Sequence, residues 1–169
     1  MRRPTPMNWQ PNITPSDRAF SALPYLMPII EAIILSVSAA GAGSILFQVP
    51  LFRPLLVLLS PLIQIYTGFP FASFIIFILL FTLVVRNEKI SRFIRYNTMQ
   101  AIMLDIVVFL CGLIIRVIFA PIGGFLVQTL ASTVFLGILV ASVYSIIQSV
   151  RGEYAEIPTI SDAVQMQIR

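Results

Sequence analysis

Histidine is absent from this chain of 169 residues, and cysteine occurs only once. The absence of histidine excludes Ser-His-Asp triads, histidine-ligated zinc or haem and imidazole acid–base catalysis. The single Cys111 cannot form an internal disulfide, and its place in an apolar run is typical of a small buried side chain. We therefore expect neither a metal site nor a bound cofactor.

Charged residues are also scarce, at 11%, whereas 58% of the residues are hydrophobic and the mean hydropathy is +0.95. A soluble domain does not need so much apolar sequence for its core. The composition predicts an all-α, polytopic membrane protein with one compact domain. The net charge of +4 does not indicate nucleic-acid binding, because the basic residues flank apolar runs instead of gathering on a soluble face.

Catalytic motifs are missing as well. There is no G-x-x-x-x-G-K-[ST] loop that would cradle the phosphates of a nucleotide. An intramembrane protease would want two catalytic aspartates or a serine with a base, whereas Glu31 and Asp105 stand alone in different apolar segments. We expect no enzymatic activity.

Long apolar segments divide the chain into a transmembrane domain, 19–149, between two polar tails, 1–18 and 150–169. The N-terminal tail is expected to be flexible, and the C-terminal tail has too few apolar residues to fold alone. Four helices are expected to span the membrane, over 19–43, 69–85, 97–119 and 125–149, with an amphipathic basic hinge helix between the second and the third.

The segment 45–66 is apolar enough to span but contains three prolines and Arg53. If it spanned, the basic residues of 86–95 would face the opposite side from those of the N-terminal tail, against the positive-inside rule. We predict a non-spanning loop with a short helix from about Pro54, re-entrant or lying at the interface. With this assignment nine basic residues lie on one side and Arg53 and Arg116 on the other. Both termini are then predicted to face the cytoplasm or stroma.

The basic hinge over residues 86–96 places Lys89, Arg92 and Arg95 around one side of a helix and apolar residues on the other. Such a pattern is typical of an amphipathic helix at the membrane surface. Two roles are open for these cations: an anchor on the phosphates of anionic lipid, or a docking surface for a protein partner.

Two carboxylates in apolar segments are the main candidate site residues, because a charge at membrane depth costs on the order of 2.5 to 3.5 kcal/mol. Asp105 lies on a polar stripe of the third span, and its partner is expected to be Glu31, Asn97, Gln100 or an interfacial arginine. Two readings are open: a structural hydrogen bond in which one carboxyl is protonated, or a hydrated path or a contact with a partner. Arg116 is predicted to snorkel to the far interface.

Small side chains recur every fourth residue in the last span. This pattern permits close approach of another helix, within the protein or between copies in a homo-oligomer. The stripe comprises Thr133, Gly137, Ala141 and Ser145.

Three blocks of the sequence carry a resemblance to a known family. They read SALPYLMPIIEAI, VVRNEKISRFIRYNTMQAIMLDI and EYAEIPTISDAVQMQIR. Together they resemble the twenty-kilodalton subunit family of the chloroplast inner-envelope translocon, the Tic system, in its cyanobacterial or plastid-encoded form. The resemblance implies a four-helix inner-membrane protein that works with other translocon subunits on transported polypeptides. The long N-terminal extension of nucleus-encoded members is lacking, so we expect synthesis in the compartment where the protein works.

Two functional hypotheses follow. In the first, the protein is a subunit of a protein-translocating assembly, and its polar stripe faces a hydrated path. In the second, it is a small-solute or ion transporter that binds its substrate or a proton at Glu31 and Asp105. An internal repeat would favour a transporter, and no repeat relates residues 19–85 to 97–149. The first hypothesis is therefore preferred.

Overall fold

The computed structural model describes residues 13 to 69, 71 to 158 and 160 to 168, and every regular element among them is a helix. This confirms the predicted all-α fold. Four helical stretches are long and apolar enough to cross a membrane, as the sequence predicts. They are Pro15–Gly43, Pro50–Gly68, Arg92–Phe119 and Gly124–Arg151.

The first stretch begins inside the segment that we expected to be a flexible tail, whose residues 1 to 12 lie outside the described part of the chain. Helix α1 (Pro15–Ala22) starts at a capping box, in which the Thr14 hydroxyl accepts from the backbone N–H of Asp17. The Asp17 carboxylate accepts in return from the backbone N–H of Thr14. Reciprocal capping of this kind satisfies two donors that would otherwise be unpaired, so the helix begins at Pro15, three residues before the expected end of the tail.

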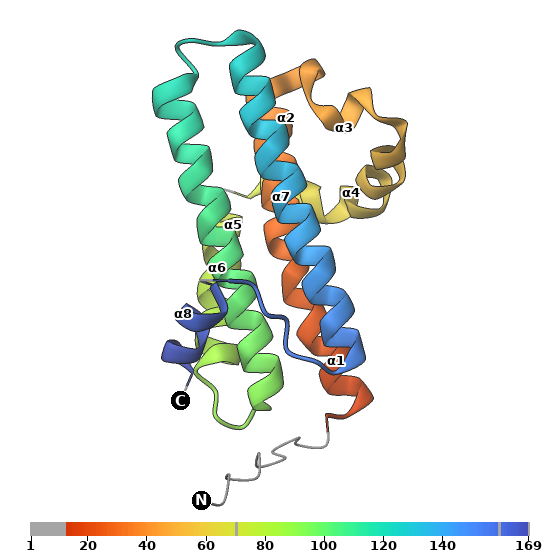
Figure 1. Ribbon diagram of the computed structural model, residues 1–169, viewed down its shortest axis with the longest axis vertical. Coiled ribbons are helices and arrows are strands. Elements are labelled where there is room, and N and C mark those ends of the chain that lie inside the picture. The colour runs from red at the N-terminus through yellow and green to blue at the C-terminus, as the bar shows by residue number, and fades with distance from the viewer. Residues whose placement is uncertain (1–12, 70, 159, 169) are drawn as a thin grey trace, which may run out of the picture.

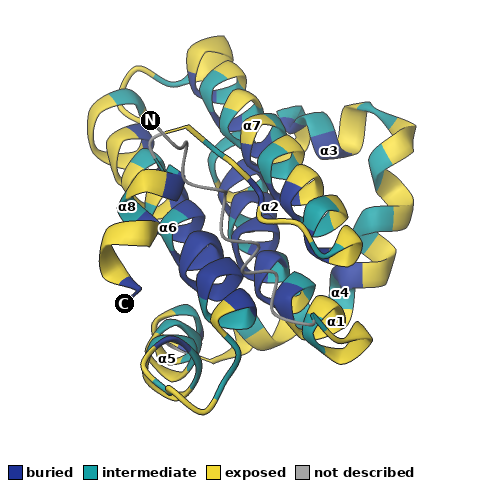
Figure 2. Ribbon diagram, turned by 60° about the horizontal axis from the view of Figure 1, so that its bottom comes forward, coloured by how far each residue is buried: buried dark blue, intermediate teal, exposed yellow. Residues whose placement is uncertain are grey.

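Three long helices form the core of the molecule. A 3₁₀ turn joins α1 to α2 (Leu26–Ala40), and the resulting rod lies beside α6 (Arg92–Ile114) and α7 (Gly124–Arg151) (Figure 1). Figure 2 shows the buried positions in dark blue along the facing sides of α2 and α6. The apolar centre is built from two large rings, Tyr25 and Phe135, and from branched or small residues that allow close packing, such as Ile33 and Ala101.

The second of the four long stretches is not the one that the sequence led us to expect. The apolar helix in the expected span 69–85 begins only at Ala72, as α5 (Ala72–Leu79), and continues as a π-helical segment to Val85. It covers about 21 Å at 1.5 Å per residue, less than the roughly 30 Å of a hydrocarbon core. The late start has a local cause, because Phe71 adopts a left-handed backbone conformation with φ of 62° immediately before the helix.

The expected non-spanning loop 45–66 contains two helices, α3 (Ile45–Gln48) and α4 (Arg53–Gly68). Helix α4 starts beside the predicted Pro54, but it runs for 16 residues, and Leu59 is its one fully buried residue. Figure 1 places α4 beside the upper half of the bundle and α5 beside the lower half of α6. The two helices thus follow one another along the bundle with a break between them, and whether α4 enters the membrane stays a prediction.

The hinge between α5 and α6 differs from the expected amphipathic helix over 86–96. Residues 86–91 form turns, and α6 starts at Arg92 because the Ser91 hydroxyl caps it by accepting from the backbone N–H of Ile94. The side chain of Asn87 accepts from the N–H of Lys89 and holds the preceding turn. Side chains that bond to nearby backbone in this way compete with a helix. The second half of the expected hinge is therefore the first turn of α6.

The start of α1, the hinge and α8 (Ile160–Gln167) all lie at the lower end of the bundle in Figure 1. The turn between α6 and α7, at residues 120–123, lies at the upper end. This arrangement is the one expected for a chain whose two tails and hinge share one side. Which compartment the lower end faces stays a prediction.

Candidate functional site

The two carboxylates that the sequence singled out lie in one chamber. Glu31 on α2 and Asp105 on α6 line the same cavity of about 300 Å³, and Ser73, Phe74 and Phe77 of α5 form its other wall. Each carboxylate stands near the middle of a helical stretch of 28 or 29 residues. If these stretches cross a membrane, the carboxylate chamber is far from both water interfaces.

Asp105 is buried without a compensating partner. Its side chain is 7% exposed, and its Oδ1 makes no hydrogen bond to any described residue. Among residues 13–69, 71–158 and 160–168 the one ion pair joins Arg151 to Glu153 at the surface, at 3.7 Å. A buried polar atom without a hydrogen bond costs on the order of 1 to 3 kcal/mol. A buried carboxylate that stays unpaired despite this cost is more typical of a functional site than of a purely structural one.

The break between α4 and α5 lies beside the carboxylate chamber. Phe71, with its left-handed backbone, comes two residues before Ser73, which lines the chamber together with Glu31 and Asp105. Tyr66 of α4, a polar residue that the sequence did not single out, lines a separate groove. Irregular backbone at membrane depth occurs where it is enclosed by protein or lines a water-filled cavity.

Asn97 and Gln100 do not reach the carboxylate chamber. The buried Tyr25 hydroxyl donates to Gln100 Oε1 at 2.7 Å and lies 3.0 Å from Asn97 Oδ1. The Ser149 hydroxyl of α7 also donates to Asn97 Oδ1, at 2.9 Å. These four residues form a polar network toward the lower end of the bundle, and it ties three helices together. The expectation that Asn97 or Gln100 pairs with Asp105 is therefore wrong.

The C-terminal segment docks onto this polar network. Gln100 Nε2 donates to the carbonyl of Ala155 at 3.2 Å and to the Ser161 hydroxyl at 3.3 Å. The ring of Tyr154 meets those of Phe93 and Tyr96 edge to face, with centroids 5.1 and 4.9 Å apart. Burial raises the pKa of the Tyr154 phenol, and the positive charge of nearby Arg92 partly opposes this. The segment was expected to be too polar to fold alone, and it becomes ordered against α6.

Arg116 lies in the π-helical segment Ile115–Phe119 that follows α6, and it is exposed. Its guanidinium donates to the Ser38 hydroxyl at 3.3 Å. It also shares a cavity of about 140 Å³ with Glu31 and Gly112. Arg116 therefore stands on the same side of α6 as the carboxylate chamber but forms no ion pair with Glu31.

The cations of the hinge divide into two kinds. Lys89 and Arg92 are exposed and available for a lipid or protein partner. Arg95 is half-buried, and its Nε donates to the carbonyl of Val85 at 2.8 Å. This bond ties the end of the π-helical segment that continues α5 to α6, so Arg95 has a structural contact that the sequence did not reveal.

The stripe of small residues on α7 does not form one continuous outer face. Thr133 and Gly137 are exposed, and a Cβ at Gly137 would meet nothing within 4 Å. Ser145 is buried and donates to the carbonyl of Ala141. An interface between copies through all four residues stays a prediction.

The fold and the carboxylate chamber define a polytopic α-helical membrane protein. Near the middle of their helical stretches, Glu31 and Asp105 have no ion-pair partner in the part of the chain that the structure describes. Residues 8–164 match the model of a family described as "Chloroplast import apparatus Tic20-like". The chain belongs to the Tic20 family.

Related proteins come from a cyanobacterium, a plant and a red alga. A "Tic20 family protein" of Synechocystis sp. is 48% identical over 155 residues, which cover 90% of this chain and 93% of the relative. "Protein TIC 20-v, chloroplastic" of Arabidopsis thaliana is 36% identical over 93% of this chain and 73% of its own. "Tic20 family protein Ycf60" of Porphyra purpurea is 31% identical over 90% of this chain and 76% of its own.

Proposed function

We propose that this protein is a multi-pass membrane subunit of a protein-import assembly, in which it works with other translocon subunits on a transported polypeptide. The family description, an import apparatus of chloroplasts, supports this role. The membrane would be a plastid inner envelope or a cyanobacterial membrane, with both termini on the stromal or cytoplasmic side. Seven of the nine basic residues on that side lie in the hinge or the N-terminal tail, in keeping with the positive-inside rule.

The carboxylate chamber is proposed to contribute polar surface to the conducting path. The observation that carries this step is the unpaired Oδ1 of Asp105 in a cavity that Glu31 also lines. Two carboxylates without partners are unfavourable in a sealed apolar bundle, but they become favourable beside water or beside passing cationic side chains. Lys and Arg side chains of a polypeptide in transit would supply the missing charge.

A site-specific photo-crosslinker tests this role directly. We would place it at Phe74, in the wall of the carboxylate chamber, and at Val140, which is exposed on the bundle's surface in α7. In membranes engaged in import, the probe at Phe74 is expected to capture the transported polypeptide and the probe at Val140 is not. Equal capture at both positions, or none at Phe74 while import proceeds, would remove the chamber from the path.

An ion or small-solute transporter remains the second candidate, because a broken helix beside charged groups at mid-depth is a feature of transporter binding sites. The break between α4 and α5 beside Glu31 and Asp105 is the observation that favours it. The two functions differ in what the purified chain can do alone. A transporter moves solute or protons in proteoliposomes that contain no other subunit, and loses this flux on Asp105→Asn. A translocon subunit shows no such flux.

A further inference from the structure

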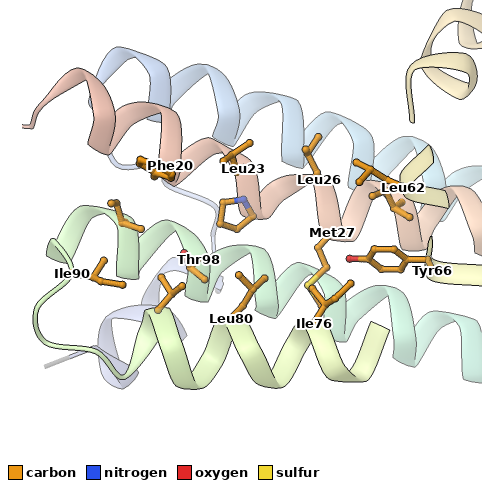
Figure 3. A pocket seen from close by; sticks show the side chains of 14 residues that line it. Phe20, Leu23, Leu26, Met27, Leu62, Tyr66, Ile76, Leu80, Ile90 and Thr98 are labelled. Carbon is orange, nitrogen blue, oxygen red and sulfur yellow. The ribbon is translucent and has the colours of Figure 1, made fainter. Parts of the chain in front are cut away.

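A second hollow in the molecule has a different chemistry from the carboxylate chamber. It is a groove of about 550 Å³ between the α1–α2 rod on one side and α5 and α6 on the other. Figure 3 shows Phe20, Leu23 and Leu26 along one wall, Ile76 and Leu80 along the other, and Ile90 at the hinge end. Apart from the hydroxyls of Thr98 and Tyr66, the side chains that line it are apolar.

The size of this apolar groove restricts what can fill it. Its wall from Phe20 to Ile30 is about 15 Å long at 1.5 Å per residue. An α-helix with its side chains is at least 10 Å across. A single extended hydrocarbon chain is far narrower and matches the apolar lining.

One polar side chain, that of Thr98, lines the groove near its hinge end. The Thr98 side chain is 0% exposed, and its hydroxyl has no hydrogen-bond partner among the described residues. Thr98 lies seven residues into the bundle from Ser91, or about 10 Å. If the hinge lies at the outer edge of a headgroup layer roughly 5 to 8 Å thick, this hydroxyl is near the border where the ester groups of phospholipids meet the hydrocarbon.

The hinge end of the groove carries a local cluster of cations. Within the hinge, Arg86, Lys89 and Arg92 are exposed and Glu88 is the one carboxylate. The same end of the bundle also carries the cations Arg18 and Arg151 and the carboxylates Asp17, Glu153, Glu156 and Asp162. Ile90, which lines the groove, directly follows Lys89. The excess of positive charge in the hinge attracts an anionic headgroup, at about a fivefold gain in affinity for each Lys or Arg near the surface.

We propose that this groove binds one acyl chain of an anionic phospholipid, with the phosphate on the hinge and the Thr98 hydroxyl donating to an ester carbonyl. The chain follows the apolar walls from Ile90 toward Tyr66. Bound lipid then fills the space between the α1–α2 rod and α5. This site does not depend on what the protein transports.

Lipid retention by the purified full-length chain tests the proposal. The protein in mild detergent would be mixed with phosphatidylglycerol or with phosphatidylcholine of the same acyl chains, and bound lipid would be counted by native mass spectrometry. We expect phosphatidylglycerol to be retained at least fivefold better. Lys89→Gln is expected to reduce this preference about fivefold, whereas Arg53→Gln, an exposed arginine far from the groove, leaves it unchanged.

Two variants probe the groove itself. Leu80→Trp fills it and is expected to lower retention of phosphatidylglycerol at least fivefold, whereas Leu83→Trp, on the exposed side of the same helix, is not. Thr98→Val keeps the volume but removes the hydroxyl and is expected to lower retention of both lipids. Wild-type retention in a folded Leu80→Trp protein would overturn the proposal, as would equal binding of both lipids.

A labelling experiment with the unmodified chain covers the case in which Leu80→Trp fails to fold. A phosphatidylglycerol with a photoreactive group at the end of its acyl chain is expected to label residues that line the groove in preference to Leu83. Uniform labelling of all lipid-facing helices would show annular lipid only. If an added apolar peptide prevents the lipid probe from labelling the groove while the protein stays folded, the groove binds a polypeptide instead of a lipid.

Discussion

The hydroxyl of Tyr25 lies 2.7 Å from Oε1 of Gln100, which is 75 residues further along the chain. Both side chains are 0% exposed, so this bond is made in the interior of the bundle. Gln100 uses its amide nitrogen at the same time to hold the C-terminal segment. A single glutamine thus connects the α1–α2 rod, α6 and the last residues of the chain.

Removal of the Tyr25 hydroxyl should therefore destabilise the whole fold. Tyr25→Phe leaves the acceptor oxygens of Asn97 and Gln100 without one donor in a buried place, and we expect a loss of about 1 to 3 kcal/mol. The midpoint of thermal unfolding in detergent, followed by circular dichroism, would measure it. Tyr144→Phe, at an exposed tyrosine of α7, is the matched control and should change the midpoint little.

The docking of the C-terminal segment should weaken at alkaline pH. Burial raises the pKa of the Tyr154 phenol, so docking favours its neutral form. The contribution is complete below the ordinary tyrosine pKa of about 10 and is lost as the pH rises through the higher value of the docked state. A spin label at the exposed Gln165, in a Cys111→Ser background, should become more mobile above that pH. In Tyr154→Phe the same label should show no such transition.

Asp105→Asn should make the protein more stable and less active. The substitution replaces a buried, unpaired carboxylate with a neutral group of the same size, and we expect a gain of roughly 1 to 3 kcal/mol. Sites that give up stability for function commonly behave in this way. Unfolding of the purified protein and import by membranes would be measured in parallel. A variant with unchanged import, or one with lower stability, would count against the proposed role of Asp105.

The close approach of α2 and α6 depends on Gly112. A Cβ at this position would lie 3.2 Å from Cδ1 of Leu35, so Gly112→Val overpacks the contact and should cost about 1 to 3 kcal/mol. Gly137→Val is the control, because a Cβ there meets nothing within 4 Å. Comparable unfolding midpoints for the two variants would contradict the packing described here.

Sequence patterns predicted the helical class, the number of long apolar helices and the two carboxylates, because these depend on local hydrophobicity and on the cost of burying charge. They did not predict that Glu31 and Asp105 meet in one chamber, since spacing along two helices does not determine how the helices rotate against each other. The role of Tyr25 was also missed. From sequence alone, a tyrosine in an apolar run is interpreted as a packing residue. Its hydrogen-bond partner, often tens of residues away, is known only from the structure.

The ends of two predicted helices were wrong, and each error had a local cause. The hinge helix was predicted from apolar periodicity over 86–96, but the side chains of Asn87 and Ser91 cap turns at that point. The span over 69–85 was predicted from uniform hydropathy, which does not register the left-handed backbone at Phe71. In both places the hydrophobic pattern correctly predicted a helix over most of the segment, but a few side-chain or backbone conformations changed where the helix begins.

The most direct test of the account is whether water reaches the carboxylate chamber in the membrane. A cysteine would be introduced by Ser73→Cys in a Cys111→Ser background, and in a second protein by Val140→Cys at the exposed surface of α7. Sealed vesicles would then be treated with a hydrophilic, membrane-impermeant thiol reagent. The account predicts labelling at position 73 and none at position 140. No labelling at 73, in vesicles that still import polypeptide, would contradict it.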